Sequence, residues 1–282
     1  MKVLVTGGAG FVGSNLIKTL IDKKHSVVSI DNYTTGLFSN HVTGCDYVNM
    51  DIRNIRDYST YGNFDIVFHL AAVARIQPSF KDPITYFETN ANGTLLLANM
   101  CSKQNIPIIY SGSSSYHSGK FKNPYTFSKG VGEEILELFS LNFGLKYSIA
   151  RFYNVYGPNQ LLEGGYTTLI GRWLANIEKG LSCEIYGDGK QTRDFTHVDD
   201  IVDALLLIME KEVYGKVFEL GRGKNISVNE VATMFNINPV YKPAKKGEAR
   251  DTLCDYTLAN KVLGWEPKIN LIDYIKELQY EN

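Results

Sequence analysis

The chain has 282 residues, of which 44% are hydrophobic and 21% charged, and its net charge is −1. These values are typical of a globular protein and exclude a disordered chain or a collagen-like repeat. Without a basic excess we expect binding neither to nucleic acid nor to a membrane surface. The apolar runs are far shorter than the roughly 20 residues of a transmembrane helix, so we expect a cytoplasmic protein. The spacing of its four cysteines and five histidines predicts no metal site.

Strand-like and helical runs alternate along the first half of the chain. The strand-like runs are continuously apolar, which is typical of a sheet that is buried on both faces. They cover residues 2–6, 26–30, 47–50, 65–70, 106–110 and 147–151, and the clearest helical runs are residues 13–23, 84–104 and 125–143. This alternation predicts an α/β fold with a doubly wound parallel sheet of the Rossmann type.

The pattern changes after Arg151. Residues 152–166 are rich in Tyr, Asn, Gly and Pro, which indicates a long functional loop. Residues 187–189 read as a turn, and Ser227 with Glu230 forms a capping box before a short helix. We therefore expect a nucleotide-binding domain over residues 1–165, to which about residues 190–220 return. Residues 166–282 are expected to form mainly a smaller C-terminal α/β substrate-binding lobe.

A glycine-rich loop lies between the first strand and the first helix. Gly7, Gly10 and Gly13 allow a tight turn, a close approach of backbone N–H groups to a pyrophosphate, and close packing of the helix on the strand. Asp31 ends the second strand, where an acidic residue binds the ribose hydroxyls of a dinucleotide. A carboxylate repels a 2′-phosphate, and the next cationic side chain, Arg53, is distant in sequence. The loop therefore predicts NAD rather than NADP as cofactor.

A Tyr-x-x-x-Lys pair at Tyr125 and Lys129 lies on one face of a predicted helix. Asn123 is a suitable N-cap for this helix, and Pro124 a suitable first residue. Three further pairs with this spacing span Gly or Pro residues and are poor helices. A nearby ammonium lowers the pKa of a tyrosine, so we expect Tyr125 to act as an acid or base. A serine cluster at residues 111–115 follows a strand at the edge where ligands bind.

Together these motifs resemble the extended short-chain dehydrogenase/reductase family, in its nucleotide-sugar epimerase/dehydratase group. The resemblance covers essentially the whole chain, from the glycine-rich segment 5–14 through segments 69–72, 90–94, 151–158 and 186–195 to the turn at 247–251. It implies that NAD is held by Gly7, Gly10, Phe11, Val12, Gly13, Asp31, Asn32, Asp51, Ile52, Leu70, Ala71, Ala72, Asn90, Tyr125, Lys129 and Phe152.

The same resemblance implies a catalytic triad of Ser113, Tyr125 and Lys129. It also implies a nucleotide-sugar site, in which the side chains that bind substrate are Ser113, Asn154, Tyr186, Arg193 and Arg250. In this interpretation Asn154 and the two arginines bind the diphosphate, and Tyr186 lies near the base. The sequence departs from the family at residues 116–118, and the stretch between Ser113 and Tyr125 is shorter than in the family. Because this stretch helps to cover the sugar in relatives, the resemblance does not determine which sugar is bound.

The resemblance implies reversible hydride transfer at a sugar carbon. Dehydratases of the family carry an Asp-Glu pair where this chain has Ser114 and Ser115, and the glutamate typical of decarboxylases is also missing. The expected reaction is therefore that of a UDP-hexose 4-epimerase, through a 4-keto intermediate. A ketoreductase, a dehydratase, an epimerase acting at another carbon and a non-catalytic NAD-binding regulator remain alternatives.

The two longest predicted helices carry apolar residues on more than one face. Examples are Leu95 in the first helix and Leu138 and Leu141 in the second. A homodimer that pairs both helices across a two-fold axis, as a four-helix bundle, would bury the outer apolar stripe. The alternative is that the chain's own C-terminal lobe covers it.

Overall fold

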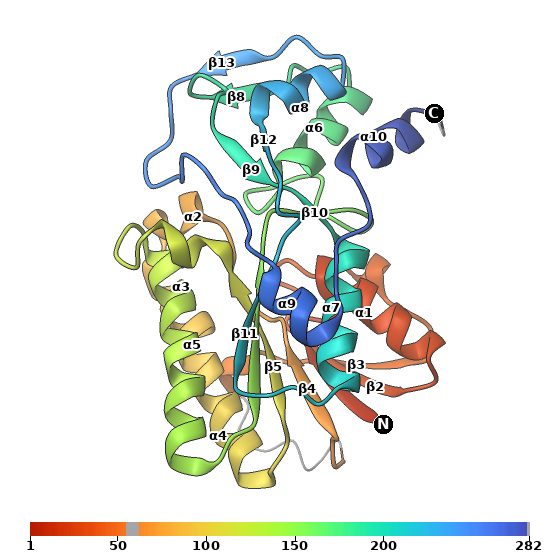
Figure 1. The fold of residues 1–282 in the computed structure, drawn as a ribbon, viewed down its shortest axis with the longest axis vertical. Coiled ribbons are helices and arrows are strands. Elements are labelled where there is room, and N and C mark those ends of the chain that lie inside the picture. The colour runs from red at the N-terminus through yellow and green to blue at the C-terminus, as the bar shows by residue number, and fades with distance from the viewer. Residues whose placement is uncertain (55–61, 281–282) are drawn as a thin grey trace.

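The computed structural model describes residues 1–54 and 62–280 (Figure 1). Its centre is a sheet of seven parallel strands in the order β11-β6-β5-β4-β1-β2-β3. These strands are β1 (Lys2–Thr6), β2 (Ser26–Asp31), β3 (Cys45–Asn49), β4 (Ile66–His69), β5 (Ile108–Ser113), β6 (Tyr147–Phe152) and β11 (Lys216–Leu220). The order reverses direction at β1, which confirms the doubly wound sheet.

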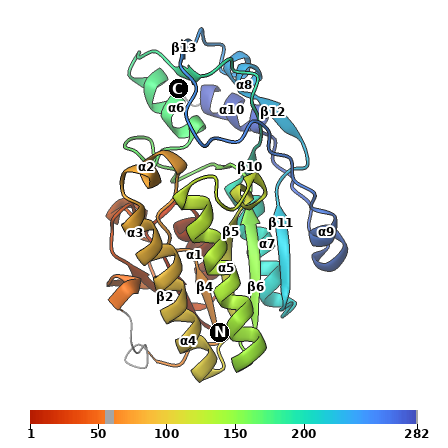
Figure 2. The same ribbon diagram turned by 90° about the vertical axis from the view of Figure 1, so that its left-hand side faces the viewer.

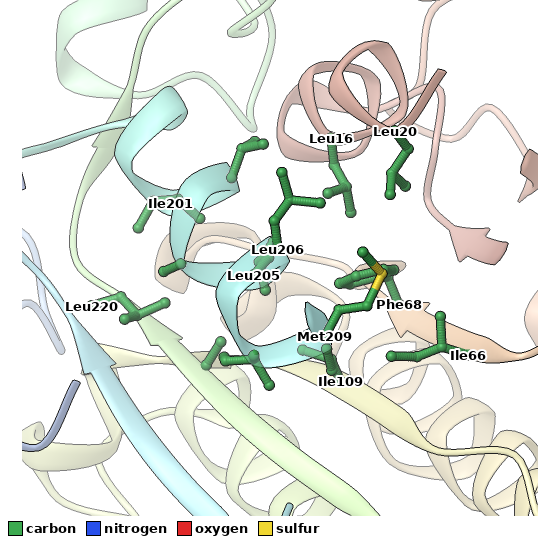
Figure 3. Close-up of a cluster of buried hydrophobic side chains, with 14 of the residues drawn as sticks. Leu16, Leu20, Ile66, Phe68, Ile109, Ile201, Leu205, Leu206, Met209 and Leu220 are labelled. Carbon is green, nitrogen blue, oxygen red and sulfur yellow. The ribbon is translucent and has the colours of Figure 1, made fainter. Parts of the chain in front are cut away.

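Helices cover both faces of the sheet (Figures 1 and 2). Those around the sheet are α1 (Phe11–Asp22), α2 (Ile76–Lys81), α3 (Pro83–Phe87), α4 (Thr94–Gln104), α5 (Pro124–Phe143), α7 (Val198–Glu210) and α9 (Thr257–Leu263). On one face α1 and α7 pack against alternate strand residues such as Phe68 and Ile109 (Figure 3). On the other face α4 and α5 pack through Leu97, Leu136 and Phe139. The inner strands are therefore buried on both sides, as their apolar runs predict, whereas the edge strands β3 and β11 are partly exposed.

The remaining elements form a smaller lobe beyond one end of the sheet (Figure 1). It contains three two-stranded pairs and three helices, while single turns connect elements elsewhere. The pairs are β7 (Val155–Tyr156) with β10 (Thr196–His197), β9 (Thr192–Asp194) with β12 (Asn225–Ser227), and β8 (Glu184–Tyr186) with β13 (Val240–Lys242). The helices are α6 (Leu169–Glu178), α8 (Val228–Met234) and α10 (Leu271–Tyr280), and the turns are η1 (Phe38–Asn40), η2 (Ile52–Asn54) and η5 (Ser114–Ser118). The proposed domain boundaries stay a prediction.

Two predicted elements differ from their observed form. The helix expected over residues 84–104 contains a π-helical turn, η4 (Glu88–Gly93), between α3 and α4. Strand β5 begins two residues later than expected and extends to Ser113, so this serine ends a strand instead of lying in a loop. Both predicted caps are present, because the Asn123 side chain accepts a hydrogen bond from the Thr126 amide and Ser227 forms its capping box with Glu230.

Across residues 1–54 and 62–280, no helix has the length and apolar character needed to cross a membrane. The four cysteines are free thiols. Within the same residues no group of three or more His, Cys, Asp or Glu side chains is placed to hold a metal ion.

Candidate active site

Two adjoining cavities lie where the carboxyl ends of the strands meet the smaller lobe. The first has a volume of about 510 Å³ and extends from the loop after β1 to Tyr125 and Tyr166. The second, of about 380 Å³, is lined mainly by the smaller lobe. Arg75, Asn154 and Arg193 line both cavities, so the two form one continuous site. The position matches the rule that ligands bind outside the carboxyl ends of parallel strands.

The glycine-rich loop forms one end of the first cavity. Gly7 has a φ of 75°, and a Cβ there would lie 2.8 Å from the Ala71 backbone. A Cβ on Gly13 would lie 2.2 Å from the Gly7 carbonyl oxygen. Helix α1 begins directly after Gly10, and no side chain caps its N-terminus. Gly7 and Gly13 therefore leave no room for a side chain, and the backbone N–H groups of the first turn of α1 suit the pyrophosphate of a dinucleotide.

Asp31 lies at the end of β2 in the same cavity. Its carboxylate accepts hydrogen bonds from the amides of Ala9 and Tyr33, at 3.0 and 2.8 Å. Burial raises the pKa of this carboxyl, and the two hydrogen bonds act in the opposite direction. Arg53, distant in sequence, does reach this cavity, but its guanidinium is paired with Asp51 and Glu88. The pocket for the adenosine ribose therefore presents a carboxylate, as NAD requires.

Two predicted cofactor residues do not line the cavity. Asp51 is engaged by Arg53 and by the Asn32 amide, which hold the pKa of its carboxyl at about 2. Asn90 is buried and exchanges hydrogen bonds with the Val73 backbone. Both side chains position cavity-lining segments. The other predicted cofactor residues all line the first cavity: Gly7, Gly10, Phe11, Val12, Gly13, Asp31, Asn32, Ile52, Leu70, Ala71, Ala72, Tyr125, Lys129 and Phe152.

The predicted triad meets in the middle of the first cavity. The Tyr125 hydroxyl donates a hydrogen bond to Ser113 Oγ at 3.2 Å, and Ser113 Oγ donates to Ser115 Oγ at 2.9 Å. Lys129 lies one helical turn beyond Tyr125 and is 4% exposed. Its Nζ has no hydrogen-bond partner and lies 4.0 Å from the centroid of the Tyr110 ring. An unpartnered buried ammonium that lines a cavity is suited to a polar ligand, such as the nicotinamide ribose.

The expected effect of Lys129 on Tyr125 is not found. Burial raises the pKa of the Tyr125 phenol, while the hydrogen bond to Ser113 and the charge of Arg75 lower it. Burial also lowers the pKa of the Lys129 ammonium to about 7, against a smaller opposing effect of Glu133. The cation that favours a Tyr125 phenolate in this structure is therefore Arg75, since Lys129 has itself lost much of its tendency to carry charge.

The predicted substrate-binding residues line the cavities, but they differ in how far their polar groups are already engaged by other residues. Asn154 Nδ2 already donates to the Asp194 carbonyl and to Thr252 Oγ1. Tyr186 lies in the second cavity beneath Lys245, whose Nζ is 3.4 Å from the ring centroid. Arg193 lines both cavities and is 3.8 Å from a Glu248 oxygen. Arg250 is exposed and forms a bidentate pair with Asp188. Arg193 is thus better placed than Arg250 to bind a diphosphate.

Sequence reasoning missed three cations that line both cavities: Arg75, Arg172 and Lys245. Arg172 donates to Thr167 Oγ1 at 2.8 and 3.1 Å. Burial lowers the pKa of Lys245, with a further contribution from the charge of Arg172. No sequence motif includes these residues, although a diphosphate ligand needs several cations and so gave a reason to look for further Lys and Arg side chains. Together with Arg193 they make the junction of the cavities an anion-binding region.

The fold and the cavity define the class of enzyme to which the chain belongs. A dinucleotide cradle faces a Tyr-Lys pair and a strand-terminal serine across one cavity, which is the arrangement of the short-chain dehydrogenase/reductases. Residues 3–221 match the model of the NAD-dependent epimerase/dehydratase family. The chain belongs to this family, and its cofactor is NAD.

Comparison with known proteins agrees with this assignment. A UDP-glucose 4-epimerase from Thermotoga maritima, solved with UDP-glucose, is 32% identical with a TM-score of 0.92, over 99% of this chain and 100% of that one. A UDP-glucuronic acid 4-epimerase from Bacillus cereus, solved with UDP-glucuronic acid and NAD, is 27% identical with a TM-score of 0.88, over 99% and 100%. A curated UDP-N-acetyl-alpha-D-glucosaminuronate decarboxylase from Bacillus cytotoxicus is 30% identical over 82% of this chain and 78% of its own length.

Proposed function

We propose that this protein is an NAD-dependent UDP-sugar 4-epimerase. The observation that carries the proposal is the hydrogen bond from Tyr125 to Ser113 in the cavity that also contains the dinucleotide cradle. Tyr125 as phenolate accepts the proton of the C4 hydroxyl, and Ser113 hydrogen-bonds the same oxygen. Lys129 holds the nicotinamide ribose. Bound NAD supplies the acceptor and donor of the C4 hydride, so that the sugar passes through a 4-keto form.

The geometry also favours epimerisation over elimination of water. The two residues after Ser113 are both serines, and Ser115 Oγ accepts a hydrogen bond from the Ser113 hydroxyl. Glu248 lines the cavities, but one of its oxygens accepts from Gln77 and another lies near Arg193. Among the described residues no unpaired carboxylate lies beside Ser113, because Glu133 and Glu219 are paired with Arg151. The 4-keto sugar is therefore expected to be reduced again, and hydride return to the opposite face gives the 4-epimer.

The test is interconversion of UDP-sugars followed by NMR with purified protein and no added NAD. We expect UDP-sugars to equilibrate with their 4-epimers. Tyr125→Phe should lower kcat by about 10²- to 10⁴-fold and leave the Kd values for NAD and UDP within a few-fold. Wild-type turnover in this variant would remove Tyr125 from its role. Net formation of a keto sugar or a dependence on added NADH would instead support dehydratase or ketoreductase activity.

The outer faces of α4 and α5 support a homodimer built as a four-helix bundle. Leu95, Leu138 and Leu141 are 38%, 52% and 79% exposed, whereas the inner residues of both helices are buried against the sheet. The smaller lobe lies at the other end of the molecule (Figure 2) and leaves this stripe exposed, so the alternative that it covers Leu138 is wrong. A two-fold pairing of the two helices would bury the stripe. A cytoplasmic location is part of the same proposal.

A further inference from the structure

Arg75 is held in an unusual conformation at the junction of the two cavities. Its φ is 82° and its ψ is 139°, a region that is unfavourable for a residue with a side chain. The Tyr86 hydroxyl contacts the carbonyl oxygens of Ala74 and Arg75, at 2.5 and 2.9 Å. Arg75 Nε donates to the Tyr166 carbonyl oxygen at 2.9 Å. The structure around Arg75 therefore fixes its backbone and aims its side chain, as is common at ligand-binding positions.

The charge of Arg75 has no partner in the described part of the chain. No Asp or Glu oxygen there lies within ion-pair distance of it, and Nε makes its one hydrogen bond. Arg151 and Arg250 differ, since Arg151 is paired with Glu133 and Glu219, and Arg250 with Asp188. Arg172 also lacks a carboxylate partner among the described residues, but its guanidinium donates two hydrogen bonds to Thr167 Oγ1. A guanidinium that lines a cavity with its terminal nitrogens unpaired is suited to bind an anion, and its planar fork matches a carboxylate.

The position of Arg75 relative to Tyr125 determines which anionic group of a bound substrate its guanidinium can bind. The Tyr86 ring, whose hydroxyl holds Arg75, packs edge-on against the Tyr125 ring with centroids 6.1 Å apart. The charge of Arg75 also acts on the Tyr125 phenol. In the proposed reaction Tyr125 meets the C4 hydroxyl, and the carbon next to C4 carries C6. The diphosphate is attached across the ring at C1. The other cations that line both cavities, Arg193, Lys245 and Arg172, are available to it.

We propose that Arg75 selects UDP-sugars that carry a carboxylate at C6, such as UDP-hexuronic acids, by pairing with that carboxylate beside Tyr125. The inference rests on the proposed UDP-sugar 4-epimerase and names its substrate class. A neutral UDP-hexose would leave the guanidinium unpaired in the cavity, so the acidic sugar is favoured by the ion pair that its carboxylate forms.

The experiment measures kcat/KM for UDP-glucuronate and UDP-glucose by NMR, with Kd values by calorimetry. Wild type is expected to prefer UDP-glucuronate by about 100-fold, the size of a charged hydrogen-bonded pair. Arg75→Gln should bring the ratio of the two kcat/KM values to about one, while kcat for both sugars falls by a common factor because the charge of Arg75 also favours the Tyr125 phenolate. Arg75→Lys should keep part of the preference. Arg172→Gln is the matched control, since it removes an equal charge from the same cavities and should affect both sugars alike.

Three outcomes overturn the inference. If the wild type prefers UDP-glucose, or if Arg75→Gln keeps the preference for UDP-glucuronate, Arg75 does not recognise the carboxylate at C6. An equal loss for both sugars and for UDP alone assigns Arg75 to the diphosphate. Should Arg75→Gln fail to fold, wild-type selectivity and Arg75→Lys still decide. Binding separates this inference from the proposed function: selective binding of UDP-glucuronate without 4-epimerisation, or with loss of CO₂, supports Arg75 and refutes the epimerase.

Discussion

Lys129 gives the sharpest prediction, because its buried ammonium opposes stability in the absence of ligand. The side chain is 4% exposed, and Nζ has no hydrogen-bond partner. Replacing it by methionine keeps the length and shape of the side chain and removes the charge. We therefore expect Lys129→Met to abolish turnover and, in protein stripped of NAD, to increase the free energy of unfolding.

The size of this effect follows from the pKa. Burial lowers the pKa of Lys129 from 10.5 to about 7. At about 1.4 kcal/mol per pKa unit, the protonated side chain opposes folding by up to about 5 kcal/mol. The unfolded chain holds the proton between pH 7 and 10.5 and the folded protein does not. The free energy of unfolding of wild type therefore rises with pH through this window, and below about pH 7 the whole opposing effect is present.

Urea unfolding of the NAD-free proteins at several pH values between 6 and 10, followed by the fluorescence of the buried Trp173 and Trp265, measures both effects. Lys129→Met should be more stable than wild type by several kcal/mol at pH 6, and the two should converge as the pH rises. Lys103→Met changes an exposed lysine and should leave the pH dependence unaltered. A Lys129→Met variant that is less stable than wild type at pH 6, or that shows the same rise with pH, would refute the reasoning.

Three further predictions concern the cofactor and the assembly. NAD should bind stripped protein at least about 100-fold more tightly than NADP by calorimetry, and equal affinities would contradict the role of Asp31. Gly13→Ala places a Cβ 2.2 Å from the Gly7 carbonyl oxygen, so NAD binding should be lost, and calorimetry that finds wild-type affinity would show that the cradle adapts. Leu138→Glu with Leu141→Glu should convert a homodimer to monomers in light scattering, whereas a monomeric wild type at micromolar concentration would end the dimer proposal.

Local patterns predicted the elements that frame the site. The glycine loop, Asp31 at the end of β2 and the Asn123 cap of α5 depend on residues close in sequence. Their chemistry can therefore be read from short motifs. The π-helical turn at Glu88–Gly93 was not predicted, because its helical periodicity hardly differs from that of an α-helix over six residues.

Contacts between distant segments were beyond sequence reasoning. The fold brings Arg53 to the cofactor cavity although it is distant from Asp31 in sequence. Its pairing with Asp51 and Glu88 keeps its guanidinium from the position that the 2′-phosphate of NADP would occupy. Motif matching assigned Asp51 and Asn90 to the cofactor. Neither lines the cavity, and their side chains bond to segments that do, so a direct contact with the cofactor stays a prediction. A motif identifies a residue that the site needs, and the structure decides whether that residue contacts the ligand or supports one that does.

The net charge of −1 illustrates the same limit at the level of electrostatics. It gives no reason to expect a nucleic-acid partner, because such binding needs an excess of cations over a large surface. It could not reveal that four cations converge on one pair of cavities: Arg75, Arg172, Arg193 and Lys245. Glu248 lines both cavities as well, while Asp31 lines only the first and Glu184 only the second. Charges in a cavity with low-dielectric walls interact strongly over short distances. The net charge of the chain does not show them, because charges of opposite sign elsewhere cancel them in the sum. The ligand that this concentration fits is a small polyanion, and the proposed UDP-sugar with a carboxylate at C6 would bring its diphosphate and its carboxylate to these cations at the junction of the cavities.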